Sequence, residues 1–154
     1  MRRRRPEKRK ILPDPLFNSL SIAKFINYIL HNGKKGVSEK IFYEAMNIIK
    51  SKTKKDGTDI FDIAIKNASP LLEVKTRRIG GANYQVPIEV PKNRQFFLAS
   101  KWIISSAKGR SGKSMSERLA TEFISAANNE GGAIKKKEDV HRMAEANRAF
   151  AHFR

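Results

Sequence analysis

The stretch from Leu71 to Pro91 constrains the fold most, because its pattern of residues does not fit a helix. Apolar residues between Tyr84 and Val90 alternate with Gln, Pro and Glu, the period of two that places one apolar row on one face of a strand. Before them stands the pair Gly80 and Gly81, which tolerates the positive φ angles of a tight hairpin turn. We therefore expect a two-stranded β-ribbon over about residues 72–90.

The rest of the sequence shows the apolar period of amphipathic helices. We expect six helices, beginning near Ser19, Val37, Thr58, Gln95, Ser114 and Ile134. The fourth, up to Ala107, should be the central and most buried helix, because apolar residues cover more than half of its circumference. Ser114 and Glu117 have the spacing of a capping box. The sixth should carry Val140, Met143, Ala144 and Phe150 on its apolar face. We assign Phe17, Phe25, Phe42, Phe61, Phe96, Phe97, Trp102, Phe123 and Phe150 to the core.

Residues 1–18 are strongly basic and then interrupted by prolines, so we expect a flexible basic N-terminal arm. Residues 19–154 have the length of one domain. The predicted fold is mainly α: a single-domain bundle of about six helices with a protruding two-stranded β-hairpin between the third and fourth helices.

The net charge of the chain restricts the kinds of partner that it can have. The formal net charge is +17, from 32 Lys and Arg against 15 Asp and Glu, which indicates a polyanionic partner and favours nucleic acid. An anionic membrane surface is the weaker alternative, because the basic residues are spread along the chain instead of gathering on one amphipathic helix. No apolar run is long enough to span a bilayer or to form an export signal, so we expect a soluble protein without membrane partners. The absence of cysteine excludes disulfides and cysteine-bound zinc.

Basic clusters lie where the expected helices begin, end or turn. Lys135 to Lys137 are the most informative, because cations at a helix N-terminus are disfavoured by the macrodipole unless an anion lies nearby. The basic run from Lys50 to Lys55 is interpreted equally well as a contact to nucleic acid and as a solvated surface. Tyr84, beside the hairpin tip, could stack on a base or pack across the ribbon.

One motif suggests an enzyme. Residues from Ala107 to Ser114 match a phosphate-binding P-loop if alanine replaces the first glycine. That loop needs a strand before it, whereas the preceding residues indicate a helix, so we interpret the loop as a contact to an RNA backbone. His31, His141 and His152 lie on separate segments without the spacing of a metal or catalytic site. We expect no catalysis, no metal and no cofactor.

Several segments together resemble the bacterial form of the seventh small-subunit ribosomal protein. The longest are Val74-Lys-Thr-Arg-Arg-Ile-Gly-Gly-Ala-Asn-Tyr-Gln-Val-Pro-Ile-Glu-Val90 and His141-Arg-Met-Ala-Glu-Ala-Asn-Arg-Ala-Phe-Ala-His152; shorter ones are Asp14-Pro15, Ala23-Lys24-Phe25, Gly33-Lys34-Lys35, Lys101-Trp102 and Lys113-Ser-Met115. The resemblance covers nearly all of the chain and implies a helical bundle with a protruding β-ribbon.

The resemblance also implies a function. It implies a cytoplasmic constituent of the small ribosomal subunit that binds the 3′ major domain of the 16S-type rRNA and nucleates assembly of the subunit head. The ribbon, Lys75 to Glu89, would lie near the exit-site tRNA and the mRNA path, with head and platform proteins as neighbours. The chain lacks the long N-terminal extension of archaeal and eukaryotic cytosolic relatives, which favours a bacterial or organellar ribosome. We expect no homo-oligomer.

The resemblance and the basic clusters predict the contact residues. For rRNA they are Arg2, Arg3, Arg4, Arg5, Lys8, Arg9, Lys10, Lys34, Lys35, Lys75, Lys92, Arg94, Lys101, Lys108, Arg110, Lys113, Arg118, Lys136 and Arg142. The part of the ribbon near tRNA and mRNA would be Arg77, Arg78, Gly80, Gly81 and Tyr84. The loop from Lys108 to Lys113 has glycines and serines where relatives commonly carry more basic residues. A helical DNA-binding protein and a P-loop-like nucleotide hydrolase remain the alternatives.

Overall fold

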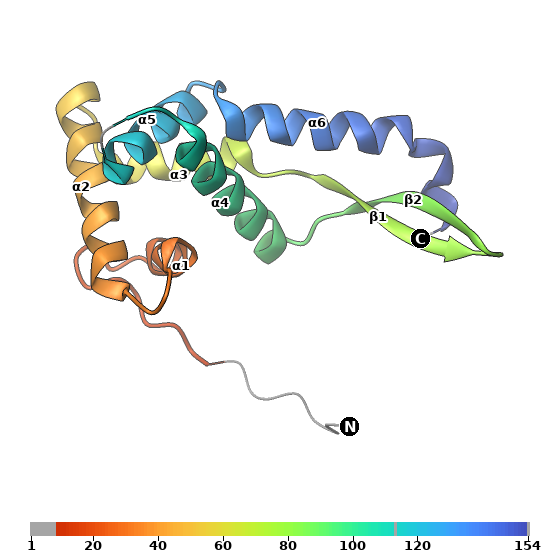
Figure 1. The fold of residues 1–154 in the computed structure, drawn as a ribbon, viewed down its shortest axis with the longest axis horizontal. Helices are drawn as coiled ribbons and strands as arrows, with labels where there is room; N and C mark the ends of the chain where they lie inside the picture. The colour runs from red at the N-terminus through yellow and green to blue at the C-terminus, as the bar shows by residue number, and fades with distance from the viewer. Residues whose placement is uncertain (1–8, 113, 154) are drawn as a thin grey trace. The chain divides into compact units, whose positions relative to one another are not determined.

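The computed structural model of the chain describes residues 9–112 and 114–153 (Figure 1). These residues form α1 (Leu20–Ile29), α2 (Lys35–Thr53), α3 (Gly57–Ala68), β1 (Leu72–Ile79), β2 (Ala82–Glu89), α4 (Lys92–Gly109), α5 (Met115–Ala127), α6 (Gly132–Ala146) and the 3₁₀ helix η1 (Arg148–Phe153). The predicted fold class is confirmed, including the hairpin between the third and fourth helices. The chain divides into two compact units, Met1–Glu39 and Lys40–Arg154.

In the first unit, a turn stabilised by Asp14 leads into α1. The Asp14 side chain is buried and accepts hydrogen bonds from the backbone N–H groups of Leu16 and Phe17, at 3.2 and 3.1 Å. Such local bonding by aspartate is why this residue favours turns over helix interiors. Ser19 is the N-cap of α1, near where the sequence predicted the start of the helix, and its hydroxyl pairs with that of Ser21 at 2.9 Å.

The core of the second unit is built around three phenylalanines. Phe42 of α2, Phe61 of α3 and Phe123 of α5 are fully buried, and their rings meet edge to face with centroids 5.5–6.4 Å apart. This is the arrangement that the ring quadrupoles favour. These three helices therefore supply the centre of the unit.

Some core assignments were wrong. The fourth helix is not the most buried, since Phe96, Phe97 and Trp102 are only half-buried, whereas half of the residues of α3 are buried. Met143 is 45% exposed, and Phe150 lies in η1 beyond the end of α6. The apolar circumference of α4 therefore predicted more burial than the helix has, because only one side of its apolar surface faces the core.

The ribbon is antiparallel, with α6 running beside β1 and η1 contacting β2 (Figure 1). Its register pairs Leu72 with Glu89 and Ile79 with Ala82. Gly80 and Gly81 form the turn with φ values of +56° and +88°, the backbone that the glycine pair predicted. A two-stranded ribbon is marginal alone, so its contacts with α6 and η1 are what hold it.

Candidate nucleic-acid interface

The tip of the ribbon presents two arginines on opposite faces. Arg77 pairs with Tyr84 and Arg78 with Asn83, and neighbouring positions of a strand point to opposite sides. Both arginines are exposed and neither forms an ion pair with any residue that the structure describes. Tyr84 is half-buried, and its ring lies 5.3 Å from that of Phe150. The tyrosine packs against the C-terminal 3₁₀ helix, while the two arginines remain accessible to a polyanion.

The end of α3, four residues before the ribbon begins, is fixed by contacts with α5 and α6. The Asn67 side chain donates to the carbonyls of Ala126 and Ala127 at the end of α5, at 3.1 and 3.0 Å. The Asn67 carbonyl in turn accepts a hydrogen bond from Lys137 at 2.7 Å. Cations are favoured at helix C-termini, where carbonyls lack partners. Lys137 therefore stabilises the end of α3 by bonding to a backbone carbonyl of the protein itself, where the sequence suggested an external phosphate.

His141 makes a second contact from α6, to the residue that precedes β1. Its Nε2 accepts the backbone N–H of Leu71 at 3.0 Å. Burial lowers the pKa of His141 below its ordinary value of 6.5, and the charge of Lys137 lowers it further. Both effects favour the neutral ring, which this hydrogen bond requires because a protonated Nε2 cannot accept. His141 is half-buried and bonded to the protein.

At the base of the ribbon, Glu73 engages two of the predicted RNA-binding residues. Its carboxylate lies 3.3 Å from Arg94 Nε and 3.6 Å from Lys75 Nζ. The Arg94 guanidinium also lies over the Phe97 ring, 5.2 Å from the centroid, within cation–π range. Lys92, at the first position of α4, is exposed and has no ion pair among the described residues. Lys92 is thus the more available cation of this cluster.

The loop after α4 is held by a buried ion pair. Arg110 Nε donates to Glu122 Oε2 at 2.5 Å, and its terminal nitrogen donates to Ser125 Oγ at 2.9 Å. The other oxygen of Glu122 accepts the backbone N–H of Ala133 at 3.0 Å. Glu122 is 1% exposed, so its charge is compensated inside the protein, as buried carboxylates require. Arg110 therefore has a structural partner, and its contact with RNA stays a prediction.

Arg118 closes the same loop from α5. It donates to the carbonyl of Lys108 at 3.3 Å and to that of Ser114 at 3.4 Å. The Ser114 hydroxyl accepts the backbone N–H of Glu117 at 3.2 Å, which confirms the N-cap predicted from the sequence. The loop is consequently fastened at both ends by side chains of α5.

The remaining predicted contacts are mostly exposed cations. Arg9, Lys10, Lys34, Lys92, Lys101, Lys108 and Lys136 are exposed and form no ion pair with any described residue. Lys35 lies 3.6 Å from Glu39, and Arg142 pairs with Asp139, both on helix surfaces. Such exposed pairs contribute little and leave the cations accessible. Arg2, Arg3, Arg4, Arg5, Lys8 and Lys113 lie outside the described residues.

The structural partners of these cations were missed, although one had a sequence signal. Glu122 lies between Leu119 and Phe123 on the side of α5 that also carries Ala126. An acidic residue within an apolar stripe indicates a buried charge that needs a partner. No local pattern indicated the bonds from Asn67 to Ala126 or from Arg94 to Glu73, whose partners are 21 or more positions apart in the chain.

The loop after α4 does not have the setting that a phosphate-binding P-loop needs. Helix α4 precedes the loop from Lys108, and the described residues contain one two-stranded antiparallel sheet, so the P-loop interpretation is wrong. Within those residues no cluster of His, Asp or Glu could hold a metal ion. Nor does any helix among them have the length and apolarity to cross a membrane.

Comparison with known proteins identifies the family. The model of the family described as ribosomal protein S7p/S5e matches residues 1–148. The small ribosomal subunit protein uS7 of Thermotoga maritima is 56% identical over 154 residues, which is 100% of this chain and 99% of that protein. Those of Teredinibacter turnerae and Moorella thermoacetica are 53% and 54% identical over 153 residues, covering 99% of this chain and 98% of each relative. The chain therefore belongs to the ribosomal protein S7p/S5e family.

Proposed function

We propose that the chain binds the 3′ major domain of the small-subunit rRNA directly and nucleates assembly of the subunit head. The coarser statement follows from the family: the chain is a structural component of the small ribosomal subunit and not an enzyme. This makes RNA the polyanion that its charge demands and leaves the DNA-binding alternative without support. The protein would accordingly be cytoplasmic, within the small subunit of a bacterial or organellar ribosome.

The observation that carries the proposal is the set of exposed cations that have no partner in the described protein. Lys92, Lys101 and Lys108 line the start, middle and end of α4, and Lys136 lies on α6. Each phosphate that such a cation neutralises releases counterions, so affinity depends steeply on salt. The rigid helices that carry the cations provide the shape by which a folded RNA is distinguished.

The ribbon supports the second part of the proposal, which is a position near the exit-site tRNA and the mRNA. Its tip extends beyond the core and presents Arg77 and Arg78 on its two faces (Figure 1). Two cations on opposite faces suit contacts to two strands or segments of RNA. Replacing both by glutamate should weaken exit-site tRNA binding by assembled subunits while leaving the melting temperature of the free protein unchanged. An equal loss of thermal stability would instead make the ribbon tip structural. Head and platform proteins would be the neighbours, and the free protein would be a monomer.

Binding of the purified protein to a 3′ major domain RNA fragment over a salt series tests the first part. An unrelated folded RNA of equal length is the control. The 3′ major domain fragment, or head fragment, should bind more tightly than the control at every salt concentration. The logarithm of each affinity should fall linearly with the logarithm of the salt concentration. If the two RNAs bind equally at every salt concentration, the chain is a general polyanion binder, and the proposal that it recognises the 3′ major domain specifically is wrong.

A further inference from the structure

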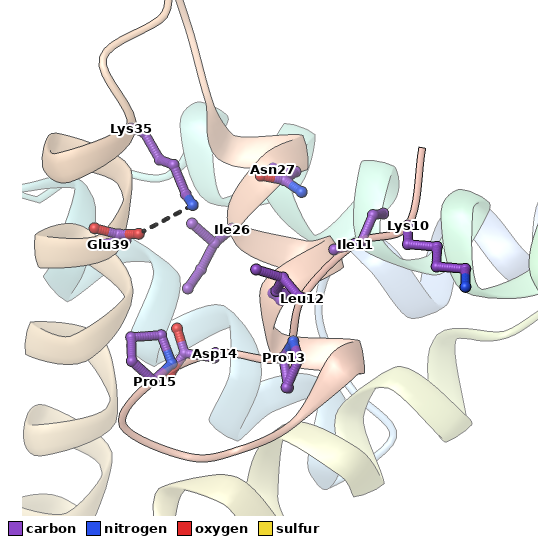
Figure 2. A pocket seen from close by; sticks show the side chains of 11 residues that line it. Lys10, Ile11, Leu12, Pro13, Asp14, Pro15, Ile26, Asn27, Lys35 and Glu39 are labelled. Atoms are coloured by element: carbon purple, nitrogen blue, oxygen red, sulfur yellow. Dashed lines mark ion pairs between the residues drawn. The ribbon is translucent and has the colours of Figure 1, made fainter. Parts of the chain in front are cut away.

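The first unit contains a cavity that the basic clusters do not explain. It has a volume of about 520 Å³ and lies between the residue 10–15 segment, α1 and the start of α2. Figure 2 shows Lys35 and Glu39 at one side of it and Lys10 at the opposite side. Its wall is mostly apolar, formed by Ile11, Leu12, Pro13, Pro15, Ala23 and Ile26. A volume in this range suits a small ligand or a single group of a larger one.

The cavity is built from a rigid segment of chain. Pro13 and Pro15 restrict the backbone on both sides of Asp14. The Asp14 carboxylate is buried and its Oδ2 already accepts the N–H groups of Leu16 and Phe17. Because Asp14 is used in this turn, it fixes the shape of the wall and is not available to bind a cation. A site that exists before binding loses less entropy when it is filled.

Its apolar wall continues onto an exposed surface. Leu12 is 80% exposed and Ile11 is 41% exposed, both directly after the cations Arg9 and Lys10. The whole unit carries ten Lys and Arg against three Asp and Glu. An apolar hollow in so basic a surface suits a ligand that combines an apolar face with negative charge. An unpaired nucleotide has both, in its base and its phosphates.

We propose that this cavity binds the base of an unpaired nucleotide in the small-subunit rRNA, an inference that rests on the proposed function. The base packs against Leu12 and the prolines. The flanking phosphates approach Lys10 on one side and Lys35 on the other. Asn27, exposed at the rim, offers an amide that both donates and accepts, as the edge of a base requires. The first unit thus recognises an unpaired base and does not bind RNA through charge alone.

Substitution of Leu12 separates a base contact from a phosphate contact. Leu12→Ser should weaken binding to the 3′ major domain fragment about five- to tenfold, because part of a leucine surface is no longer covered. The slope of log Kd against log salt should not change, since no phosphate contact is lost. Lys10→Gln should instead reduce that slope by about one. Leu16→Ser is the matched control: Leu16 is 67% exposed, on the same segment, and does not line the cavity. It should bind like wild type.

Cross-linking then identifies the nucleotide. Ultraviolet irradiation of the complex, followed by mass spectrometry, should attach one nucleotide to peptide 11–15 or 23–27. Replacing that nucleotide by an abasic one should weaken wild-type binding as much as Leu12→Ser does. The two changes together should weaken it no further, because both remove the same contact.

Two results overturn the inference in distinguishable ways. If wild type binds the head fragment and the control RNA equally, the proposed function fails and the base pocket fails with it. If wild type prefers the head fragment but Leu12→Ser binds as tightly, or the abasic and Leu12→Ser losses add, only the base pocket is wrong. In that second case, we would assign the exposed Leu12 to a contact with a neighbouring protein. Equal melting temperatures of the variants and wild type exclude misfolding as the cause of any loss.

Discussion

Replacing Arg110 by methionine should destabilise the protein by about 3 kcal/mol. The change leaves the carboxylate of Glu122, 1% exposed, without its counter-charge at 2.5 Å. Removing one partner of a buried ion pair costs about 3–5 kcal/mol. We take the lower end, because the Arg110 side chain is 30% exposed and water already screens part of the interaction. For a chain of this size the melting temperature should fall by about 6–12 °C.

A second substitution tests the cause. Adding Glu122→Gln to Arg110→Met removes the uncompensated charge but keeps an oxygen for the N–H of Ala133, which Glu122 accepts at 3.0 Å. The double variant should therefore be more stable than Arg110→Met alone, by about 1–2 kcal/mol. Urea unfolding followed by far-UV circular dichroism measures both free energies. A loss below about 1 kcal/mol for Arg110→Met, or no rescue by Glu122→Gln, would mean that the pair is not buried as described.

The same double variant decides what Arg110 does for RNA. If Arg110 only positions the loop, the salt slope of binding to the 3′ major domain fragment should equal that of wild type. A slope smaller by about one would instead show that its guanidinium also contacts a phosphate. Arg118→Met is not a suitable substitute, because its donors hold the carbonyls at both ends of the loop.

Three further perturbations test the ribbon and its attachment. Asn67→Ala should cost about 1–3 kcal/mol in urea unfolding, since two carbonyls at the end of α5 lose their donor. Gly81→Val should speed hydrogen exchange of the ribbon amides without moving the main unfolding transition, because φ is +88° there but no atom lies within 4 Å of the new Cβ. Wild-type stability should rise with pH up to about 6.5, because below that value the unfolded chain binds a proton that folded His141 resists. His141→Gln should reduce this slope, with Lys137, Glu145 and Arg148 unchanged around it; an identical slope would exclude His141 as its source.

Local patterns predicted the six α-helices and the ribbon, but not the 3₁₀ helix η1. The alternation from Tyr84 to Val90 and the glycine pair before it specify a strand and a turn within a few residues, and the structure has both. The N-cap at Ser114 is equally local. The first turn of α4 was missed: the helix begins at Lys92, directly after Pro91, where Lys, Asn and Arg supply no apolar periodicity.

Contacts between distant residues were beyond such patterns. Nothing in the sequence around His141 indicates that its ring accepts the N–H of Leu71, 70 positions earlier. The same holds for Lys137 and the carbonyl of Asn67. A basic residue near a helix end is compatible both with a phosphate outside and with a carbonyl inside the protein. Only the packing of α6 against the start of the ribbon distinguishes the two.

Basic residues in this chain therefore have two roles, and counting charges does not separate them. Arg94, Arg110, Arg118 and Lys137 all bond to groups of the protein itself. A phosphate that took one of them would leave a carboxylate or carbonyl unpaired, a loss that offsets the gain. Exposed cations without such partners lose only hydration and freedom when they bind. The salt slope should consequently report fewer phosphate contacts than the 32 Lys and Arg of the chain, and charge reversal at an exposed site such as Lys92 should weaken RNA binding without a loss of stability.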